Sequence, residues 1–289
     1  MVTTPLRERM RSVLRARNYS PRTEAIYIDA VAHFARHFGK SPEQLGAAHV
    51  TEYQIWLREH KRVSVSAFNQ VVCALRFLYG QILERPDEVH RIAYAMKGRR
   101  LPVVLSQEET ARFLSSINSR RHQVLLITIY SSGLRISEAL GLRGRDIDSS
   151  RMLIRVRQGK GKKDRYVPLS PILLDLLREH WRREGLSDLL FPAVRNPTQP
   201  MDCATVQRYV QAAWKRSGLT KKVTPRTLRH SYATHLIEKG TSTRVVQVLL
   251  GHTNVHTTET YTHVSPQTMI KAGSPLDDWV AALSPLQPR

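Results

Sequence analysis

The stretch LLGHTNVHTTETYTHV, residues 249–264, constrains the fold and chemistry of this chain more than any other segment. An apolar run from Val245 to Leu250 has helical spacing, and we expect Gly251 to end that helix, because glycine readily takes the left-handed conformation found at helix ends. Tyr261 then follows on an expected turn. Tyrosine is a weak nucleophile at its ordinary pKa of about 10. Tyr261 is therefore either an ordinary core side chain or a nucleophile surrounded by cations.

The composition is strongly basic. Lys and Arg number 45 against 24 Asp and Glu, giving a formal net charge of +21 over 289 residues. This surplus is spread along the whole chain, and such self-repulsion favours a polyanionic partner, with nucleic acid as the first candidate. No apolar run reaches the roughly 18 residues of a membrane span, and the N-terminus lacks the apolar core of a signal peptide. We expect a protein of a bacterial cytoplasm with no membrane partner.

The first 95 residues have helical periodicity and no strand-like alternation, which predicts a small helical domain. Ser20 and Pro21 form an N-cap and first-position pair at the start of one helix. Thr51 is expected to cap a second helix, and a third is expected from Ser64 to Leu83.

Residues 96–102 combine glycine and proline with a basic cluster, which indicates a linker between two domains. The cluster supplies Lys97, Arg99 and Arg100. These side chains either contact a DNA backbone or belong to a solvated connector, and the sequence supports both interpretations equally.

From Val103 onward the pattern is mixed. Ser106 and Glu109 form a capping box, and further helices are expected around residues 124–130, 171–183 and 202–217. Residues 151–157 alternate apolar side chains with arginines, as in a strand with one buried and one cationic face. A turn at 159–162 and an apolar return at 165–169 complete a β-hairpin. The predicted fold class is therefore mainly α with a small β-sheet, in which a helical domain precedes a mixed α+β domain.

Several cations stand where a phosphate site would need them. Arg135 and Glu138 lie three residues apart, so the carboxylate can steer the guanidinium, although an ordinary surface ion pair has the same spacing. Lys160 lies between two glycines at the hairpin tip, where it either gives a proton to a departing oxygen or is simply solvated. The neighbouring hairpin cations are either backbone-phosphate contacts or solubility charges; they are Lys162, Lys163 and Arg165.

A helix expected to start at Thr224 and Pro225 carries two more arginines. Arg226 and Arg229 would lie near its N-terminus, where backbone N–H groups and the helix dipole attract anions. Leu228, Tyr232, Leu236 and Ile237 are expected to form the buried face of this helix.

These segments together resemble the catalytic signature of the tyrosine recombinase (phage integrase) family, in the right order over residues 103–265. The matching segments are Gly133-Leu134-Arg135-Ile136-Ser137-Glu138, Gly159-Lys160-Gly161, Leu228-Arg229-His230, Leu250-Gly251-His252 and Tyr261-Thr262-His263-Val264. The N-terminal helices, with Tyr19-Ser20-Pro21-Arg22-Thr23, resemble the family's core-binding domain. The chain is similar to Xer-type members in size. Its tail is more similar to recombinases of insertion sequences and other mobile elements.

The resemblance implies a reaction and a set of roles. Tyr261 would attack a DNA phosphate and form a 3′-phosphotyrosyl link, while Lys160 would protonate the leaving 5′-oxygen. Arg135, Arg229 and His252 would stabilise the transition state, with Glu138 positioning Arg135. Because the link conserves the phosphodiester energy, no cofactor is expected. His252 and His256 have an HxxxH spacing but no accompanying ligand, so no metal is expected.

Arg226 departs from the family pattern, because it stands where the family usually has the histidine of a His-x-x-Arg motif. Arginine stays protonated in proteins and is not a credible general base. We expect Arg226 to act electrostatically, by favouring the phenolate of Tyr261 or by binding the phosphate.

The resemblance also implies an organisation. Residues 1–95 would be the core-binding domain, 96–102 the linker and 103–289 the catalytic domain, together forming a C-shaped clamp on double-stranded DNA. A homotetramer would exchange a C-terminal segment, about residues 266–289, through Leu276, Trp279, Val280 and Leu283; docking of that segment on its own chain is the alternative. A partner recombinase and association with the nucleoid are further expectations.

Two alternatives to a site-specific recombinase stay open from the sequence alone. A type IB topoisomerase would use the same chemistry on one duplex. A DNA-binding protein that has lost activity is suggested by Arg226, although the presence of Tyr261, Lys160 and two family arginines opposes it.

Overall fold

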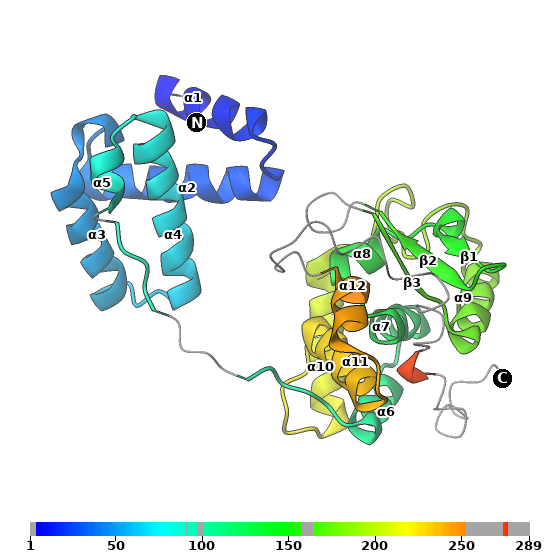
Figure 1. Cartoon of the computed structure of the whole chain (residues 1–289). Coiled ribbons are helices and arrows are strands. Elements are labelled where there is room, and N and C mark those ends of the chain that lie inside the picture. The colour runs from blue at the N-terminus through cyan, green and yellow to red at the C-terminus, as the bar shows by residue number, and fades with distance from the viewer. Residues whose placement is uncertain (1–3, 91, 97–100, 158–163, 252–273, 277–289) are drawn as a thin grey trace. The chain divides into compact units, whose positions relative to one another are not determined.

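The computed structural model describes residues 4–90, 92–96, 101–157, 164–251 and 274–276. The chain divides into two compact units, Met1–Arg100 and Leu101–Arg289 (Figure 1). Among the described residues, no helix is both long and apolar enough to cross a membrane.

The first unit is helical wherever it has regular structure among its described residues. Its α2 packs mainly along α4, with α1 lying against α2. Phe34, Leu75 and Tyr79 are fully buried in the core of this unit. The elements are α1 (Pro5–Ala16), α2 (Pro21–Phe38), η1 (Pro42–Gln44), α3 (Ala47–Glu59), α4 (Val65–Phe77), η2 (Leu78–Ile82) and α5 (Pro86–His90).

Of two helix N-caps predicted in this unit, one is present and one is not. The Ser20 side chain accepts a hydrogen bond from the Thr23 N–H, which confirms the predicted cap of α2. The prediction that Thr51 caps a helix is wrong, because α3 starts at Ala47 with Gly46 as its N-cap. The Thr51 hydroxyl instead donates to the Ala47 carbonyl inside the helix.

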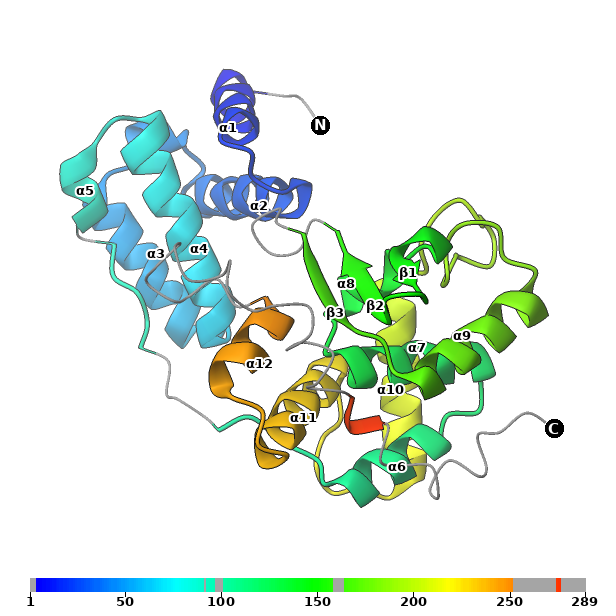
Figure 2. The ribbon, with the colours of Figure 1, turned by 45° about the vertical axis from the view of Figure 1, so that its right-hand side comes forward.

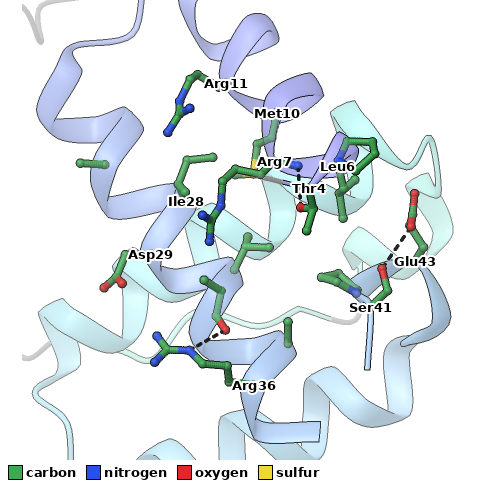
Figure 3. A pocket seen from close by; sticks show the side chains of 16 residues that line it. Thr4, Leu6, Arg7, Met10, Arg11, Ile28, Asp29, Arg36, Ser41 and Glu43 are labelled. Atoms are coloured by element: carbon green, nitrogen blue, oxygen red, sulfur yellow. Dashed lines mark hydrogen bonds between the residues drawn. The ribbon is translucent and has the colours of Figure 1, made fainter. Parts of the chain in front are cut away.

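A cavity of about 810 Å³ opens between α1, α2 and η1 (Figure 3). Met10 and Ile28 give it apolar walls. Charges of both signs also line it, including Arg36 and Asp29 (Figure 3). The cavity is therefore not a cationic site for a phosphate.

The second unit is built around α7, in which every residue from 122 to 132 is buried. Both α9 and α11 pack on it, on opposite sides (Figures 1 and 2). The elements are α6 (Gln107–Ser115), α7 (Arg120–Ser132), α8 (Ile136–Leu140), η3 (Gly144–Asp146), β1 (Ile147–Asp148), β2 (Leu153–Val156), β3 (Arg165–Pro168), α9 (Pro171–Glu184), α10 (Cys203–Ser217), α11 (Pro225–Glu238) and α12 (Thr243–Leu250).

The sheet is small and antiparallel, in the order β1-β2-β3, with Ile154 opposite Val167. The predicted hairpin is therefore present in its strands, and β1 adds a two-residue strand that no sequence pattern indicated. The mainly helical fold with a small sheet confirms the predicted fold class.

Two local expectations in the second unit need correction. The strand β2 starts at Leu153, because Met152 has a φ of 53° and belongs to the preceding turn. Ile237 is 46% exposed, so it does not share the buried face of α11. Leu276 is fully buried in the core of its own chain, and the Ser274 hydroxyl beside it donates to the Ser131 carbonyl. Exchange of this segment between copies stays a prediction.

Candidate active site

Arg135 and Glu138 meet at the start of α8, directly after α7 ends. Gly133 ends α7 with a φ of 60°, a conformation that favours glycine. Arg135 is the N-cap of α8, and its backbone N–H donates to the Glu138 carboxylate at 2.9 Å. Its guanidinium Nη1 donates to the same carboxylate at 2.6 Å. The predicted pairing of these two side chains is confirmed.

Two further arginines converge on Glu138 from other elements. Arg165, at the start of β3, donates from Nη1 and Nη2 to the two carboxylate oxygens at 2.9 and 2.8 Å. Arg229, on α11, lies 3.8 Å away. We call these four residues the Glu138 cluster: Arg135, Glu138, Arg165 and Arg229. The Glu138 side chain is only 6% exposed, so the cluster is a buried charge network.

The charge state of Glu138 follows from its neighbours. Burial by itself raises the pKa of the Glu138 carboxyl, but the hydrogen bonds and charge of Arg165, joined by those of Arg135, outweigh burial and lower this pKa to about 2. Glu138 is therefore ionised at neutral pH. One carboxylate against three guanidinium groups leaves a surplus of positive charge for a bound anion.

The same three arginines hold the carboxyl end of α12. Arg165 Nε donates to the Leu249 carbonyl at 2.8 Å, Arg229 Nη2 donates to the Leu250 carbonyl, and Arg135 Nη2 donates to the Gly251 carbonyl at 3.0 Å. Cations at a helix C-terminus are favoured, because the last carbonyls carry partial negative charge. Gly251, which His252 follows in the sequence, is thereby fixed relative to α8 and α11.

Arg229 is buried in spite of its charge. Burial, and then the neighbouring charge of Arg135, lower the pKa of its guanidinium to about 10, while Glu138 opposes this shift. It therefore stays protonated at neutral pH. Its Nη1 also donates to the Gly133 carbonyl at 2.7 Å, which links α11 to the end of α7.

Arg226 and Arg229 have different surroundings although they lie one turn apart on α11. Thr224 caps this helix and Pro225 opens it, as predicted. The exposed Arg226 donates from Nε to His230 Nε2 at 3.2 Å. Burial, and then the charges of Arg226 and Arg229, lower the pKa of His230, so its imidazole is held neutral. Sequence reasoning gave His230 no role, and only its position directly after Arg229 pointed to one.

Several predicted site residues lie outside the described residues. They are Lys97, Arg99, Arg100, Lys160, Lys162, Lys163, His252, Tyr261, Trp279, Val280 and Leu283. Among the described residues, the structure brings together Arg135, Glu138 and Arg229. It also adds Arg165, which the sequence predicted to be either a contact to the DNA backbone or a solubility charge. In that same part of the chain, no three His, Cys, Asp or Glu side chains are grouped as metal ligands.

The geometry of the Glu138 cluster suits a phosphate whose charge rises during a reaction. Rigid guanidinium groups in a largely buried site stabilise such charge with little rearrangement. Arg135 is the most accessible of the three arginines, with 27% of its side chain exposed. The cluster alone supplies binding and electrostatic stabilisation, but no nucleophile.

Comparisons with known proteins show which family the chain belongs to. Residues 103–268 match the phage integrase family, and residues 6–89 match the phage integrase N-terminal SAM-like domain. The Sinorhizobium fredii protein y4qK, provisionally named an integrase/recombinase, is 41% identical over 280 residues, covering 96% of this chain and 90% of that protein. The tyrosine recombinase XerA of Thermococcus kodakarensis is 35% identical, covering 88% of each chain.

A solved structure is also similar. The XerH site-specific recombinase, bound to difH substrate in a pre-cleavage complex, matches 94% of this chain and 84% of its own, with a TM-score of 0.67 and 25% identity. The similarity therefore extends over both compact units.

Proposed function

The chain belongs to the phage integrase family and is a tyrosine site-specific recombinase, an enzyme that breaks and rejoins DNA, and from this premise we propose that Tyr261 is its nucleophile. The phenolate oxygen of Tyr261 bonds to a scissile phosphorus as the bond to the 5′-oxygen breaks. Lys160 gives that oxygen a proton, so a 5′-hydroxyl leaves. The 3′-phosphotyrosyl link conserves the phosphodiester energy, so rejoining needs no cofactor.

The Glu138 cluster supports the electrostatic part of this proposal. Arg135 and Arg229 donate to the oxygens that gain charge in the transition state, and His252 joins them directly after Gly251. Glu138 holds Arg135 through a 2.6 Å hydrogen bond, and its negative charge offsets the repulsion between the guanidinium groups of Arg135 and Arg229. The single observation that carries the proposal is this convergence of two family arginines on one buried carboxylate.

Arg226 acts as a second electrostatic group rather than as a base. Its exposed guanidinium contacts the neutral His230 and is not part of the Glu138 cluster. A cation there favours the phenolate form of a nearby tyrosine or binds the phosphate. Cleavage therefore proceeds without the family histidine.

The substrate is a DNA duplex that carries a recombination site, which suits a chain of net charge +21. Exchange between two duplexes breaks four strands, so four copies of the chain form the active assembly. The segment exchanged between copies lies within about residues 266–289. The N-terminal helices are the core-binding domain, residues 96–102 are the linker, and linker cations Lys97, Arg99 and Arg100 follow the DNA backbone. A partner recombinase and a place at the nucleoid are finer expectations of the same proposal.

The test is covalent trapping on a nicked suicide duplex that carries the native site. Wild type should form a protein–DNA adduct that survives denaturation, whereas Tyr261→Phe should bind the same duplex and form none. If wild type binds the duplex but forms no adduct, the result would instead favour the alternative that the chain is a DNA-binding protein that has lost its catalytic activity.

A further inference from the structure

Arg165 has contacts that its position in the sequence does not suggest. It is the first residue of β3, the strand that leaves the basic hairpin, yet its side chain is only 10% exposed. Both terminal nitrogens donate to Glu138, and Nε donates to the Leu249 carbonyl at 2.8 Å. Each of its three nitrogens is thus committed to a partner in the same chain. Arg229 is equally inaccessible, with 9% of its side chain exposed, but its hydrogen bonds to Gly133 and Leu250 use Nη1 and Nη2, whereas Arg165 uses all three nitrogens and binds Glu138 with both ends of its guanidinium fork.

We propose that Arg165 is a positioning residue for strand cleavage, which holds Glu138 against Arg135 and fixes the carboxyl end of α12 to the hairpin strand without contacting DNA. The inference rests on the proposed function, because it assigns Arg135 to the reacting phosphate. It moves Arg165 from the expected set of backbone contacts to the support of the catalytic arginines.

The electrostatic part of the argument concerns Glu138. Its carboxylate is almost inaccessible to water and depends on partners for its charge. Arg165 supplies two parallel hydrogen bonds, the strongest arrangement available to a carboxylate. Without them, burial favours the protonated acid, which attracts Arg135 less strongly. Arg135 and Arg229 would then repel each other with less compensation.

The mechanical part concerns the end of α12. Arg165, Arg229 and Arg135 take the carbonyls of residues 249, 250 and 251 in turn, so Arg165 joins β3 to the segment before His252. Gly251 permits this close approach. A Cβ added at Gly251 would lie 3.2 Å from both Cδ and Nη1 of Arg165, a contact tighter than ordinary packing. Its φ of 59° also favours glycine.

A matched control lies on the same hairpin. Arg155, on β2, is 49% exposed and makes an ion pair with Asp164 at 2.9 Å. It does not belong to the Glu138 cluster. Replacing either arginine by methionine removes one charge and keeps an unbranched apolar stem. The two variants therefore differ mainly in the contacts that are lost, which are those to Glu138 and Leu249 for Arg165 and the ion pair with Asp164 for Arg155.

The experiment compares wild type, Arg165→Met, Arg165→Lys and Arg155→Met as full-length chains. Single-turnover cleavage of the suicide duplex at saturating protein should fall about 100-fold or more in Arg165→Met, in line with the loss of one well-placed transition-state donor. Arg155→Met should cleave as wild type does. Arg165→Lys keeps the charge but loses the fork, so its rate should lie between those of wild type and Arg165→Met.

Two readouts separate positioning from simple loss of structure or of a DNA contact. The salt dependence of DNA affinity should keep its slope in Arg165→Met, whereas losing a phosphate contact would lower the slope by about 0.9. In a plot of cleavage rate against pH, the acid limb should move to higher pH in Arg165→Met, because the Glu138 carboxylate becomes easier to protonate. Arg165→Lys should keep this limb close to that of wild type. If Arg165→Met fails to fold, the pH profile and rate of Arg165→Lys decide the question.

A lowered salt slope with an unchanged rate at saturation would overturn the inference and return Arg165 to the DNA backbone. An unmoved acid limb together with an unchanged rate would also overturn it. The proposed function fails separately, if wild type itself forms no adduct. A double variant sharpens the result: adding Arg165→Met to Glu138→Gln should cost less than it costs alone, because both changes act through the same carboxylate.

Discussion

Each compact unit contains a carboxylate shared between arginines, and the two differ in what surrounds them. In the first unit, Glu24 accepts from Arg11 and Arg15 at 3.0 Å, and these arginines are 32% and 66% exposed. All three residues lie on the neighbouring helices α1 and α2. In the second unit, the arginines of Glu138 come from α8, β3 and α11, and two of them are at most 10% exposed.

The difference shows that the same ion pair chemistry serves two purposes. Around Glu24, water screens the charges and each arginine holds little else, so the group ties two helices together weakly. Around Glu138, little water reaches the carboxylate, and each arginine also holds a carbonyl at the C-terminal end of α12. A change at Glu138 therefore moves several elements and the charges that the reaction needs.

The largest expected effect is on cleavage rate. Glu138→Gln should lower the rate of adduct formation roughly 10²–10³-fold, because Arg135 loses its partner and the remaining arginines repel. Glu24→Gln should leave the rate unchanged. Single-turnover assays of both variants at saturating protein measure this, with circular dichroism as the check on folding. Equal losses of cleavage rate in Glu138→Gln and Glu24→Gln would contradict the claim that the reaction depends on the buried carboxylate and not on the exposed group.

The pH dependence of stability should also separate the two carboxylates. The pKa of Glu138 is about 2 in the folded chain against an ordinary 4.5, so its contribution is complete above pH 4.5 and disappears as pH falls toward 2. The shift corresponds to on the order of 3 kcal/mol. The difference in unfolding free energy between wild type and Glu138→Gln should therefore shrink across this window.

Denaturant unfolding at pH 7, 4.5 and 3 measures that difference. The pKa of Glu24 is also lowered, first by the hydrogen bond from Arg15, but Arg15 is 66% exposed and water screens this pair, so Glu24→Gln should show little dependence on pH. A constant difference between wild type and Glu138→Gln down to pH 3 would contradict the buried network.

Two glycines extend the comparison to packing. Gly39 and Gly133 each end a helix with φ near 60°, so alanine costs about 1 kcal/mol at either position from its backbone alone. A Cβ at Gly39 would meet nothing within 4 Å, whereas one at Gly133 would lie 2.4 Å from Cδ1 of the buried Tyr232. Gly133→Ala should therefore be about 2 kcal/mol less stable than Gly39→Ala. Equal unfolding free energies for Gly133→Ala and Gly39→Ala would show that the packing around Gly133 rearranges to accept the added methyl group at no cost.

The smallest expected effect concerns Arg226, the exposed arginine of α11. Arg226→His restores the usual family residue, and because Arg226 acts through its charge, cleavage should change by less than about tenfold. Arg226→Ala is the matched variant without a charge and should cleave more slowly than wild type. A rise well beyond tenfold in Arg226→His would show that the natural site lacks a base that it needs.

The sequence predicted those parts of the fold and of the site that depend on local contacts. The capping box at Ser106, the start of α11 at Thr224 and the Arg135–Glu138 pair all depend on residues within three positions of one another. The resemblance placed Arg229 in the same site. The Thr51 cap failed because threonine also occurs inside helices, where its hydroxyl returns to the backbone, and Gly46 gives no side-chain signal.

Contacts between residues far apart in the chain could not be predicted from the sequence. Arg165 lies 27 residues from Glu138, and its guanidinium reaches Glu138 only because the tertiary fold packs β3 against α12 beside the start of α8. In the sequence it is one more basic residue of a basic hairpin. The two-residue strand β1 is too short to show any periodicity. The capture of three successive carbonyls by three arginines likewise depends on tertiary structure alone.

The most direct test of the central claim is to identify the residue that carries the DNA after trapping. Trypsin releases residues 245–271 as one peptide, in which Tyr261 is the single tyrosine. Mass spectrometry of the digested adduct should find the nucleotide mass on Tyr261. An adduct on a different residue, or wild type that binds the suicide duplex without forming one, would contradict the account.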